Sequence, residues 1–313
     1  MAKAKIAAVF PGQGSQYVGM GKELAEKHPI VAETFAEADE ALKFSLSRLC
    51  FEGPEEELTL TRNTQPALLV TSVAIFRLLE AHGFAPDLGA GHSLGEYSAL
   101  VAAGAMSFAD AVRTVRLRGE LMEEAVPPGQ GTMAAILGLE RELVEALCRE
   151  VAGVVEPATY NSPGQVVVAG DTEAVHALME RALAKGARRA QLLKVSGPFH
   201  SSLLAGAGQR LGEWLASIPI APPKFPVYSN VTAAPVTTPE EIRACLARQV
   251  SAPVRWEESV RNMVAEGATR FVEVGPGRVL SGLIKRIERE AELFNVESEG
   301  TFQAFLQEVA RER

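Results

Sequence analysis

The stretch that constrains this chain most is Gly91-His92-Ser93-Leu94-Gly95, which has the pattern Gly-x-Ser-x-Gly. A short run of small residues precedes it at 88–90, and a sequence suited to a helix follows at 96–103. This is the strand, sharp turn and helix of a nucleophile elbow, in which a serine hydroxyl projects from the apex of the turn. The flanking glycines remove Cβ atoms where the backbone must bend tightly. An ordinary glycine-rich turn also fits the pentapeptide. The rest of the chain must therefore decide between such a turn and a nucleophile elbow.

The composition is that of a globular protein without a basic surface. Hydrophobic residues make up 47% and charged residues 22% of the 313 residues, a normal balance for a folded domain. The formal net charge of -8 argues against nucleic acid as a partner, and an acidic partner would need a local basic patch. No apolar stretch reaches transmembrane length, and Cys50, Cys148 and Cys245 are too widely spaced for a disulfide framework or a metal site. We therefore expect a soluble, cytoplasmic protein with no membrane partner.

Continuous apolar runs predict strands of a parallel sheet that is buried on both faces. Such runs lie at 6–10 and 271–274, and a glycine-containing turn follows each of them. The first turn, 11–16, resembles a dinucleotide fingerprint, but Tyr17 stands where the third glycine belongs. We therefore expect a ligand site at the end of this strand, and a nucleotide site is the less favoured form of it.

The order of predicted elements changes after the Pro- and Gly-rich boundary at 127–131. We predict a strand at 133–139, a helix at 140–151, strands at 154–160 and 165–169, a helix to 185 capped by Asp171, and a strand at 187–195. This β-α-β-β-α-β order is the ferredoxin-like pattern. The expected fold is α/β, with a small inserted domain of residues 129–196 inside a larger domain of residues 1–128 and 197–313.

Arg118 lies on the inward face of a helix predicted from the cap at Ser107 to about residue 125. At 100° per residue it falls among apolar residues such as Leu121 and Met122, whereas the other charged side chains share the opposite arc. A buried and unpaired guanidinium is very costly, so Arg118 should meet a carboxylate. The carboxylate could belong to the protein or to a substrate, and the helix pattern leaves both open.

A serine nucleophile needs a base, and His200 is the best candidate for it. It follows a Gly-Pro turn at the point where the chain leaves the predicted insert, whereas the other histidines lie on helices or on the elbow itself. The group that orients His200 is less clear. Asp171 falls between Ser93 and His200 in sequence, as in α/β-hydrolases, but it also suits a helix cap, and a backbone carbonyl can take the same role.

Several separated motifs together resemble the malonyl-CoA:acyl carrier protein transacylases of bacterial fatty-acid synthesis. In family order they are FPGQGSQ at 10–16, NTQPA at 63–67, GHSLGEY at 91–97, RLRG at 116–119, YNSPGQ at 160–165, GPFHS at 197–201, RQ at 248–249 and EVGPG at 273–277. They span nearly the whole chain. The resemblance implies an α/β-hydrolase-like main domain with a parallel sheet and a ferredoxin-like insert.

The resemblance also implies a role for each candidate site residue. Ser93 would be the nucleophile and His200 the base, with the backbone N–H groups of Gln13 and Leu94 as the oxyanion hole. Arg118 would hold the malonyl carboxylate. The remaining roles are a backbone carbonyl near Gln249 that orients His200 and leaves Asp171 as a helix cap, Gln65 and Asn161 as lining residues, and Phe199 as the aromatic residue that favours malonyl over methylmalonyl.

The implied reaction is a ping-pong transfer of malonyl from coenzyme A to the phosphopantetheine thiol of acyl carrier protein, through a malonyl-serine ester. The coenzyme A thioester is a substrate, and no metal or redox cofactor is expected. Because these carrier proteins are acidic, we expect a basic patch near the site, for which Lys285 and Arg286 are candidates.

Three alternative functions remain at this stage. A serine esterase or lipase would use the same elbow but would need an apolar acyl pocket, against which Arg118 argues. A non-catalytic scaffold protein would have an inert Ser93. A polyketide-type acyltransferase would accept another extender unit.

Overall fold

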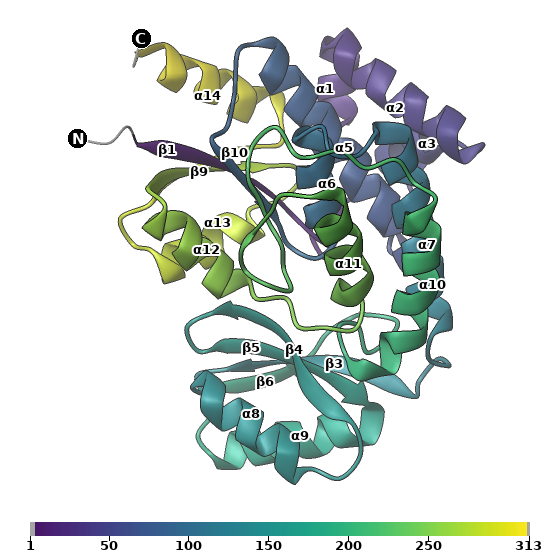
Figure 1. Cartoon of the computed structure of the whole chain (residues 1–313), viewed down its shortest axis with the longest axis vertical. Helices are drawn as coiled ribbons and strands as arrows, with labels where there is room; N and C mark the ends of the chain where they lie inside the picture. The colour runs from purple at the N-terminus through teal and green to yellow at the C-terminus, as the bar shows by residue number, and fades with distance from the viewer. Residues whose placement is uncertain (1–3, 312–313) are drawn as a thin grey trace.

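The computed structural model describes residues 4–311, which form an α/β fold with two sheets (Figure 1). The larger sheet has six strands in the order β10-β9-β1-β2-β7-β8, and the smaller has four in the order β4-β5-β3-β6. In Figure 1 the four-stranded sheet and its helices α8 and α9 occupy the lower part of the molecule, and the six-stranded sheet occupies the upper part. The α/β class predicted from the sequence is therefore confirmed.

The six-stranded sheet is mostly parallel. Its strands are β1 (Lys5–Phe10), β2 (Leu88–Gly91), β7 (Val227–Tyr228), β8 (Pro235–Val236), β9 (Ala268–Val274) and β10 (Glu292–Val296). Strand β1 pairs in parallel with β2 and β9, β9 with β10, and β2 with β7, whereas β8 runs antiparallel to β7. The two strands predicted from continuous apolar runs are β1 and β9, which are neighbours in the interior of this sheet.

Helices cover both faces of the six-stranded sheet. The helices outside the smaller sheet are α1 (Lys22–Lys27), α2 (Pro29–Leu42), α3 (Leu46–Glu52), α4 (Glu55–Leu58), α5 (Thr61–Ala81), α6 (Gly95–Ala102), α7 (Phe108–Glu124), α10 (Ala205–Ala216), α11 (Pro239–Gln249), α12 (Trp256–Ala265), α13 (Val279–Ile287) and α14 (Glu299–Arg311). A short 3₁₀ helix spans Ser202–Leu204. None of the helices in the described part of the chain combines the length and apolar character needed to cross a membrane.

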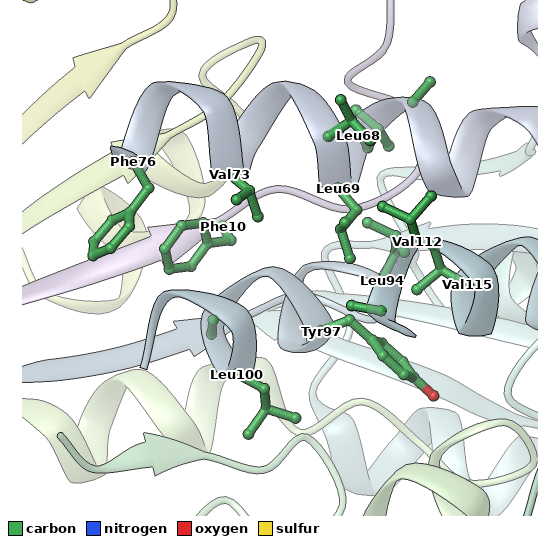
Figure 2. Packing of buried hydrophobic residues seen from close by; sticks show 14 of the residues in the cluster. Phe10, Leu68, Leu69, Val73, Phe76, Leu94, Tyr97, Leu100, Val112 and Val115 are labelled. Atoms are coloured by element: carbon green, nitrogen blue, oxygen red, sulfur yellow. The ribbon is translucent and has the colours of Figure 1, made fainter. Parts of the chain in front are cut away.

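Alternate residues of β1 point to opposite faces of the sheet, as the strand period requires. Ala8 and Phe10 pack in a core cluster with α2, α5, α6 and α7, whereas Ala7 and Val9 pack with α12 and α13. Figure 2 shows Phe10 beside Phe76 of α5, and their ring centroids lie 6.0 Å apart. Because both faces of β1 are buried, the strand reads in sequence as one uninterrupted apolar run.

The four-stranded sheet has the predicted order of elements, with boundaries shifted by up to three residues. It contains β3 (Gly131–Leu137), α8 (Arg141–Glu150), β4 (Val155–Ser162), β5 (Gln165–Asp171), α9 (Thr172–Ala184) and β6 (Arg189–Leu192). All three strand pairings are antiparallel, and a separate apolar cluster fills the space between this sheet and its two helices.

The capping role predicted for Asp171 is wrong. Asp171 does stand at the residue before α9, but its side chain makes no capping hydrogen bond to that helix. Its carboxylate instead accepts a hydrogen bond of 2.7 Å from the backbone N–H of Val154. The carboxylate thus ties the start of β4 to the end of β5. By contrast, the predicted cap at Ser107 is confirmed, since its hydroxyl accepts from the N–H of Asp110.

The elbow between β2 and α6 depends on close backbone approach. A Cβ atom on Gly91 would lie 1.9 Å from the carbonyl carbon of Gly95, and one on Gly95 would lie 2.0 Å from the carbonyl oxygen of Phe10. Ser93 itself takes the left-handed backbone conformation at the apex, with φ 51°. Because Phe10 pairs with Gly91, the turn after β1 and the elbow lie side by side at one edge of the sheet.

Candidate active site

The structure brings the predicted serine and histidine into direct contact. The hydroxyl of Ser93 donates to Nε2 of His200 at 2.7 Å, and Nδ1 of His200 donates to the backbone carbonyl of Gln249 at 2.8 Å. A carbonyl oxygen can only accept, so Nδ1 carries the proton and Nε2 is free to accept one from the serine. This is the arrangement that general-base activation of a serine needs, with a carbonyl in the place of a carboxylate.

His200 is held in its neutral form. Burial and the nearby positive charge of Arg118 lower the pKa of His200 to about 3. Both effects disfavour the imidazolium ion. At neutral pH the imidazole therefore has a free electron pair on Nε2.

Arg118 lies on the inward face of α7, as the helix pattern predicts, and only 1% of it is exposed. Its Nη1 donates to Oε1 of Gln65 at 2.7 Å, and its Nη2 donates to Oε1 of Gln249 at 2.9 Å and to Oγ of Ser93 at 3.1 Å. All three acceptors are neutral, and no Asp or Glu residue in the described chain forms an ion pair with Arg118. Of the two alternatives left by the sequence, the structure does not support an ion pair within the protein.

A cleft of about 790 Å³ opens beside Ser93. The predicted site residues that line it are Gln13, Ser93, Leu94, Arg118, Asn161, Phe199 and His200. Gln65 and Gln249 are buried and do not line the cleft. Each accepts a hydrogen bond from the guanidinium group of Arg118, which does line it. The structure thus brings together residues that are far apart in sequence and come from both sheets.

Gln13 and Leu94 lie on the two segments that meet at the elbow. Gln13 belongs to the turn after β1, and its side chain donates to the hydroxyl of Thr61 at 3.0 Å. Leu94 is the residue before α6, where backbone N–H groups have no partner within the helix. A Cβ atom on Gly12 would lie 2.4 Å from the carbonyl oxygen of His92, so the turn after β1 packs directly against the elbow.

Asn161 and Phe199 both line the cleft. Asn161 comes from β4, and its Oδ1 lies 2.7 Å from Nε2 of His92, the residue before the serine. Burial lowers the pKa of His92, so this imidazole is also neutral and its Nε2 donates to Asn161. Phe199 is buried next to His200 and presents its ring to the cleft.

Two further residues hold the elbow, and the sequence analysis did not identify them. Asn230 accepts from the N–H of Ser93 and donates to the carbonyl of Gly91, both at 2.7 Å. Glu96 is buried at the start of α6, and burial raises its pKa to about 7. Glu96 could have been found from the sequence, because it is a charged residue at the start of an otherwise apolar helix directly after the elbow. No local pattern marks Asn230.

Lys285 and Arg286 lie at the C-terminal end of α13, a helix that contributes Val279, Leu280 and Leu283 to the cleft. Both basic side chains are exposed. Nη1 of Arg286 donates at 3.0 Å to the side chain of Gln165, which also lines the cleft. Arg286 therefore contacts the cleft lining, whereas Lys285 donates to the carbonyl of Arg289, and the basic patch expected from the sequence stays a prediction.

Comparisons with known proteins identify the family of this chain. A family model described as "Acyl transferase domain" matches residues 8–304. The malonyl CoA-acyl carrier protein transacylase of Bacillus subtilis is 50% identical over 312 residues, which are 99% of this chain and 98% of that protein. The enzyme of the same name from Escherichia coli K12 is 51% identical over 286 residues, covering 90% of this chain and 93% of that protein.

Solved structures are similar over almost the whole chain. A crystal structure of an acyl carrier protein S-malonyltransferase from Vibrio cholerae has a TM-score of 0.95 and 46% identity, and covers 96% of this chain and 100% of that one. A malonyl-transacylase solved in complex with a type II polyketide acyl-carrier protein has a TM-score of 0.96 and 47% identity, with coverage of 97% and 100%.

The lowered pKa of His200 predicts how stability depends on pH. Between pH 6.5 and about 3 the unfolded chain binds a proton at residue 200 that the folded protein does not. The free energy of unfolding therefore decreases as the pH is lowered through this range. From pH 6.5 to 5 this residue should remove about 2 kcal/mol. His200→Gln should abolish that part of the loss when urea unfolding is measured between pH 7 and pH 5. Equal pH slopes for wild type and His200→Gln would contradict the assignment, and Ser93→Ala, which keeps the imidazole, should keep the wild-type slope.

Proposed function

The chain belongs to the malonyl-CoA–acyl carrier protein transacylase family, and we propose that it moves a malonyl group from coenzyme A to the phosphopantetheine thiol of an acyl carrier protein. The observation that carries this proposal is the position of Arg118. A buried guanidinium 3.1 Å from the nucleophile, without a carboxylate from the protein, matches an acyl group that brings its own carboxylate. A neutral acyl chain, as an esterase or lipase would bind, leaves that charge unpaired.

In the first half-reaction the oxygen of Ser93 attacks the thioester carbon, and Nε2 of His200 takes the serine proton. The tetrahedral oxyanion accepts hydrogen bonds from the backbone N–H groups of Gln13 and Leu94. The carbon–sulfur bond then breaks, His200 returns the proton to the sulfur, and coenzyme A leaves as the thiol. The product is a malonyl ester on Ser93.

In the second half-reaction the carrier-protein thiol takes the place of coenzyme A. His200 accepts the thiol proton, the sulfur attacks the ester carbon, and the proton returns to the oxygen of Ser93 as the ester bond breaks. The cycle is a ping-pong exchange between two thioesters. It uses only side chains and backbone groups of this chain, so we propose that it needs no metal or redox cofactor.

Arg118 supplies both binding and selectivity in this mechanism. Its planar fork can donate two parallel hydrogen bonds to the malonyl carboxylate while Gln65 and Gln249 hold the guanidinium from behind. Asn161 lines the wall beside the acyl group. We propose that the buried ring of Phe199 limits space next to the reacting carbon and disfavours a methyl branch such as that of methylmalonyl.

We propose that the two sheets correspond to two domains. The elbow after β2 and the parallel centre of the larger sheet support an α/β-hydrolase-like domain of residues 1–128 and 197–313. The antiparallel order β4-β5-β3-β6, with both helices on one side, supports a ferredoxin-like insert of residues 129–196. The cleft takes its lining from both, which suits a site that must admit two long thioester substrates.

An acyl carrier protein is the proposed macromolecular partner, as in the complex of the similar malonyl-transacylase. We propose that exposed Lys285 and Arg286 on α13 complement its acidic surface, since Arg286 contacts Gln165 of the cleft lining. The three cysteines are free, in keeping with the cytoplasmic location expected from the sequence.

Brief incubation with malonyl-CoA, followed by intact-protein mass measurement, tests the proposed function. We expect a malonyl adduct on the wild type and none on Ser93→Ala. Arg118→Ala should acylate about 100-fold more slowly with malonyl-CoA, because its loss leaves the substrate carboxylate buried and unpaired. Arg113→Ala, on the exposed face of the same helix, should behave like the wild type.

Acetyl-CoA and methylmalonyl-CoA serve as comparison substrates in the same experiment. The proposal requires malonyl to be strongly preferred by the wild type and the preference to fall in Arg118→Ala. Equal adducts from all three thioesters, or no adduct from any of them on folded protein, would contradict it and point to the esterase or scaffold alternatives.

Charge reversal at the basic patch separates the two half-reactions. Lys285→Glu together with Arg286→Glu should slow malonyl transfer to the carrier protein by about tenfold and leave acylation by malonyl-CoA unchanged, because only the first depends on protein docking. Single-turnover rates for each half-reaction provide the measurement. Arg181→Glu, on α9 of the smaller sheet, is the control and should change neither rate. Equal slowing of both half-reactions by the double variant would show that the patch assignment is wrong.

A further inference from the structure

Glu96 is a buried carboxylate beside the site that the proposed mechanism does not use. It is the second residue of α6, only 1% of it is exposed, and it follows the elbow directly. Its Oε2 accepts two hydrogen bonds, one of 3.0 Å from the backbone N–H of Asn230 and one of 2.7 Å from Nε2 of Gln249. A buried acidic residue with such partners must contribute to how those partners are placed.

The side-chain amide of Gln249 has one orientation that its surroundings accept. Its Nε2 faces three acceptors, which are Oε2 of Glu96 at 2.7 Å, the carbonyl of Ser93 at 3.0 Å and Oδ1 of Asn230 at 3.1 Å. Its Oε1 faces a donor, Nη2 of Arg118, at 2.9 Å. The flipped amide would set an oxygen against three acceptors and an N–H group against a guanidinium.

Glu96 makes the shortest of the three contacts that fix this orientation. Each of the three acceptors also takes a second hydrogen bond. Oε2 of Glu96 accepts from the N–H of Asn230, Oδ1 of Asn230 from the N–H of Ser93, and the carbonyl of Ser93 from the N–H of Glu96. Oε2 of Glu96 can accept whether or not the carboxyl group carries a proton on its other oxygen, so the orientation does not depend on the charge of Glu96. Removing this acceptor would take away the shortest of these contacts and leave the amide held only by the two longer ones and by Arg118.

The orientation of Gln249 decides where Arg118 points. With Oε1 of Gln249 and Oε1 of Gln65 as neutral acceptors, the guanidinium is held beside Ser93 without an ion pair that would occupy it. A carboxylate in direct contact with Arg118 would compete with the substrate for the same N–H groups. Because Gln249 lies between them, Glu96 can affect the position of Arg118 without a direct hydrogen bond to it.

We propose that Glu96 is a positioning residue that fixes the side-chain amide of Gln249 and thereby holds Arg118 in the position that selects acyl groups bearing a carboxylate. This inference rests on the proposed function, because it assigns selectivity to the same site. The side chain of Glu96 makes no hydrogen bond to the hydroxyl of Ser93 or to Arg118, and it acts through Gln249.

The test compares Glu96→Gln, which keeps an acceptor oxygen at the same place, with Glu96→Met, which keeps the volume and removes the acceptor. The readout is the ratio of kcat/KM for acylation by malonyl-CoA to that by acetyl-CoA. We expect Glu96→Met to lower the ratio by about tenfold or more, mainly through KM for malonyl-CoA, and Glu96→Gln to stay within about threefold of the wild type. If Glu96 had a purely structural role, Glu96→Met would lower kcat/KM equally for malonyl-CoA and acetyl-CoA.

Glu273→Met is the matched control. Glu273 is also a fully buried glutamate, but it accepts from the N–H groups of Leu280 and Ser281 at the start of α13 and makes no contact with Gln249 or Arg118. This variant should lose stability without changing the substrate ratio. An unchanged ratio in Glu96→Met, or a ratio in Glu96→Gln as low as in Glu96→Met, would overturn the proposal.

A second readout does not depend on the enzymatic activity. The side-chain amide protons of Gln249, identified in NMR spectra by their loss in Gln249→Met, should exchange slowly in the wild type and in Glu96→Gln and faster in Glu96→Met. If the wild type showed no preference for malonyl, the proposed function would fail while this exchange still decided the role of Glu96. If Glu96→Met did not fold, loss of slow exchange or of the substrate ratio in Glu96→Gln would still overturn the proposal.

Discussion

The site depends on a guanidinium that is buried next to a nucleophile without a carboxylate from the protein. Arg118 is held by neutral oxygens, so its charge is available to a substrate. Close packing of α7 on α5 makes this possible, since a Cβ atom on Gly119 would lie 2.6 Å from the Cα atom of Arg62. The small residue lets the helix that carries Arg118 approach the helix that carries Gln65.

Gln249 connects this charge to the base. Its backbone carbonyl orients His200, and its side chain accepts from Arg118. The hydrogen bond to the carbonyl raises the pKa of His200, but burial and the charge of Arg118 outweigh this effect. A carboxylate at the same position would raise the pKa further and would compete for Arg118. Burial and the charge of Arg118 keep the imidazole neutral, and Gln249, at the end of α11, contacts both the imidazole and the guanidinium. Together these groups suit acyl transfer with a charged acyl group.

The sequence predicted the parts of the site that depend on local patterns. Glycine spacing predicted the elbow, and helix periodicity predicted the inward position of Arg118. The Gly-Pro turn before His200 predicted its position in a loop. The link from His200 to Gln249 came only from the family resemblance, and Asn230 was missed. Each contact joins segments that are far apart in sequence, so no local pattern predicts it. Short strands such as β7, β8 and β10 carry too few residues for a pattern, and the side chain of Asp171 bonds to Val154 across the sheet where a local rule expected a cap.

The most direct measurement of the central claim is a crystal structure of the protein acylated by malonyl-CoA in the absence of a carrier protein. We expect an ester on Ser93, its carbonyl oxygen at the backbone N–H groups of Gln13 and Leu94, and the malonyl carboxylate within hydrogen-bond distance of both terminal nitrogens of Arg118. A malonyl carboxylate directed toward the cleft mouth, with Arg118 still bonded only to Gln65, Gln249 and Ser93, would contradict the account.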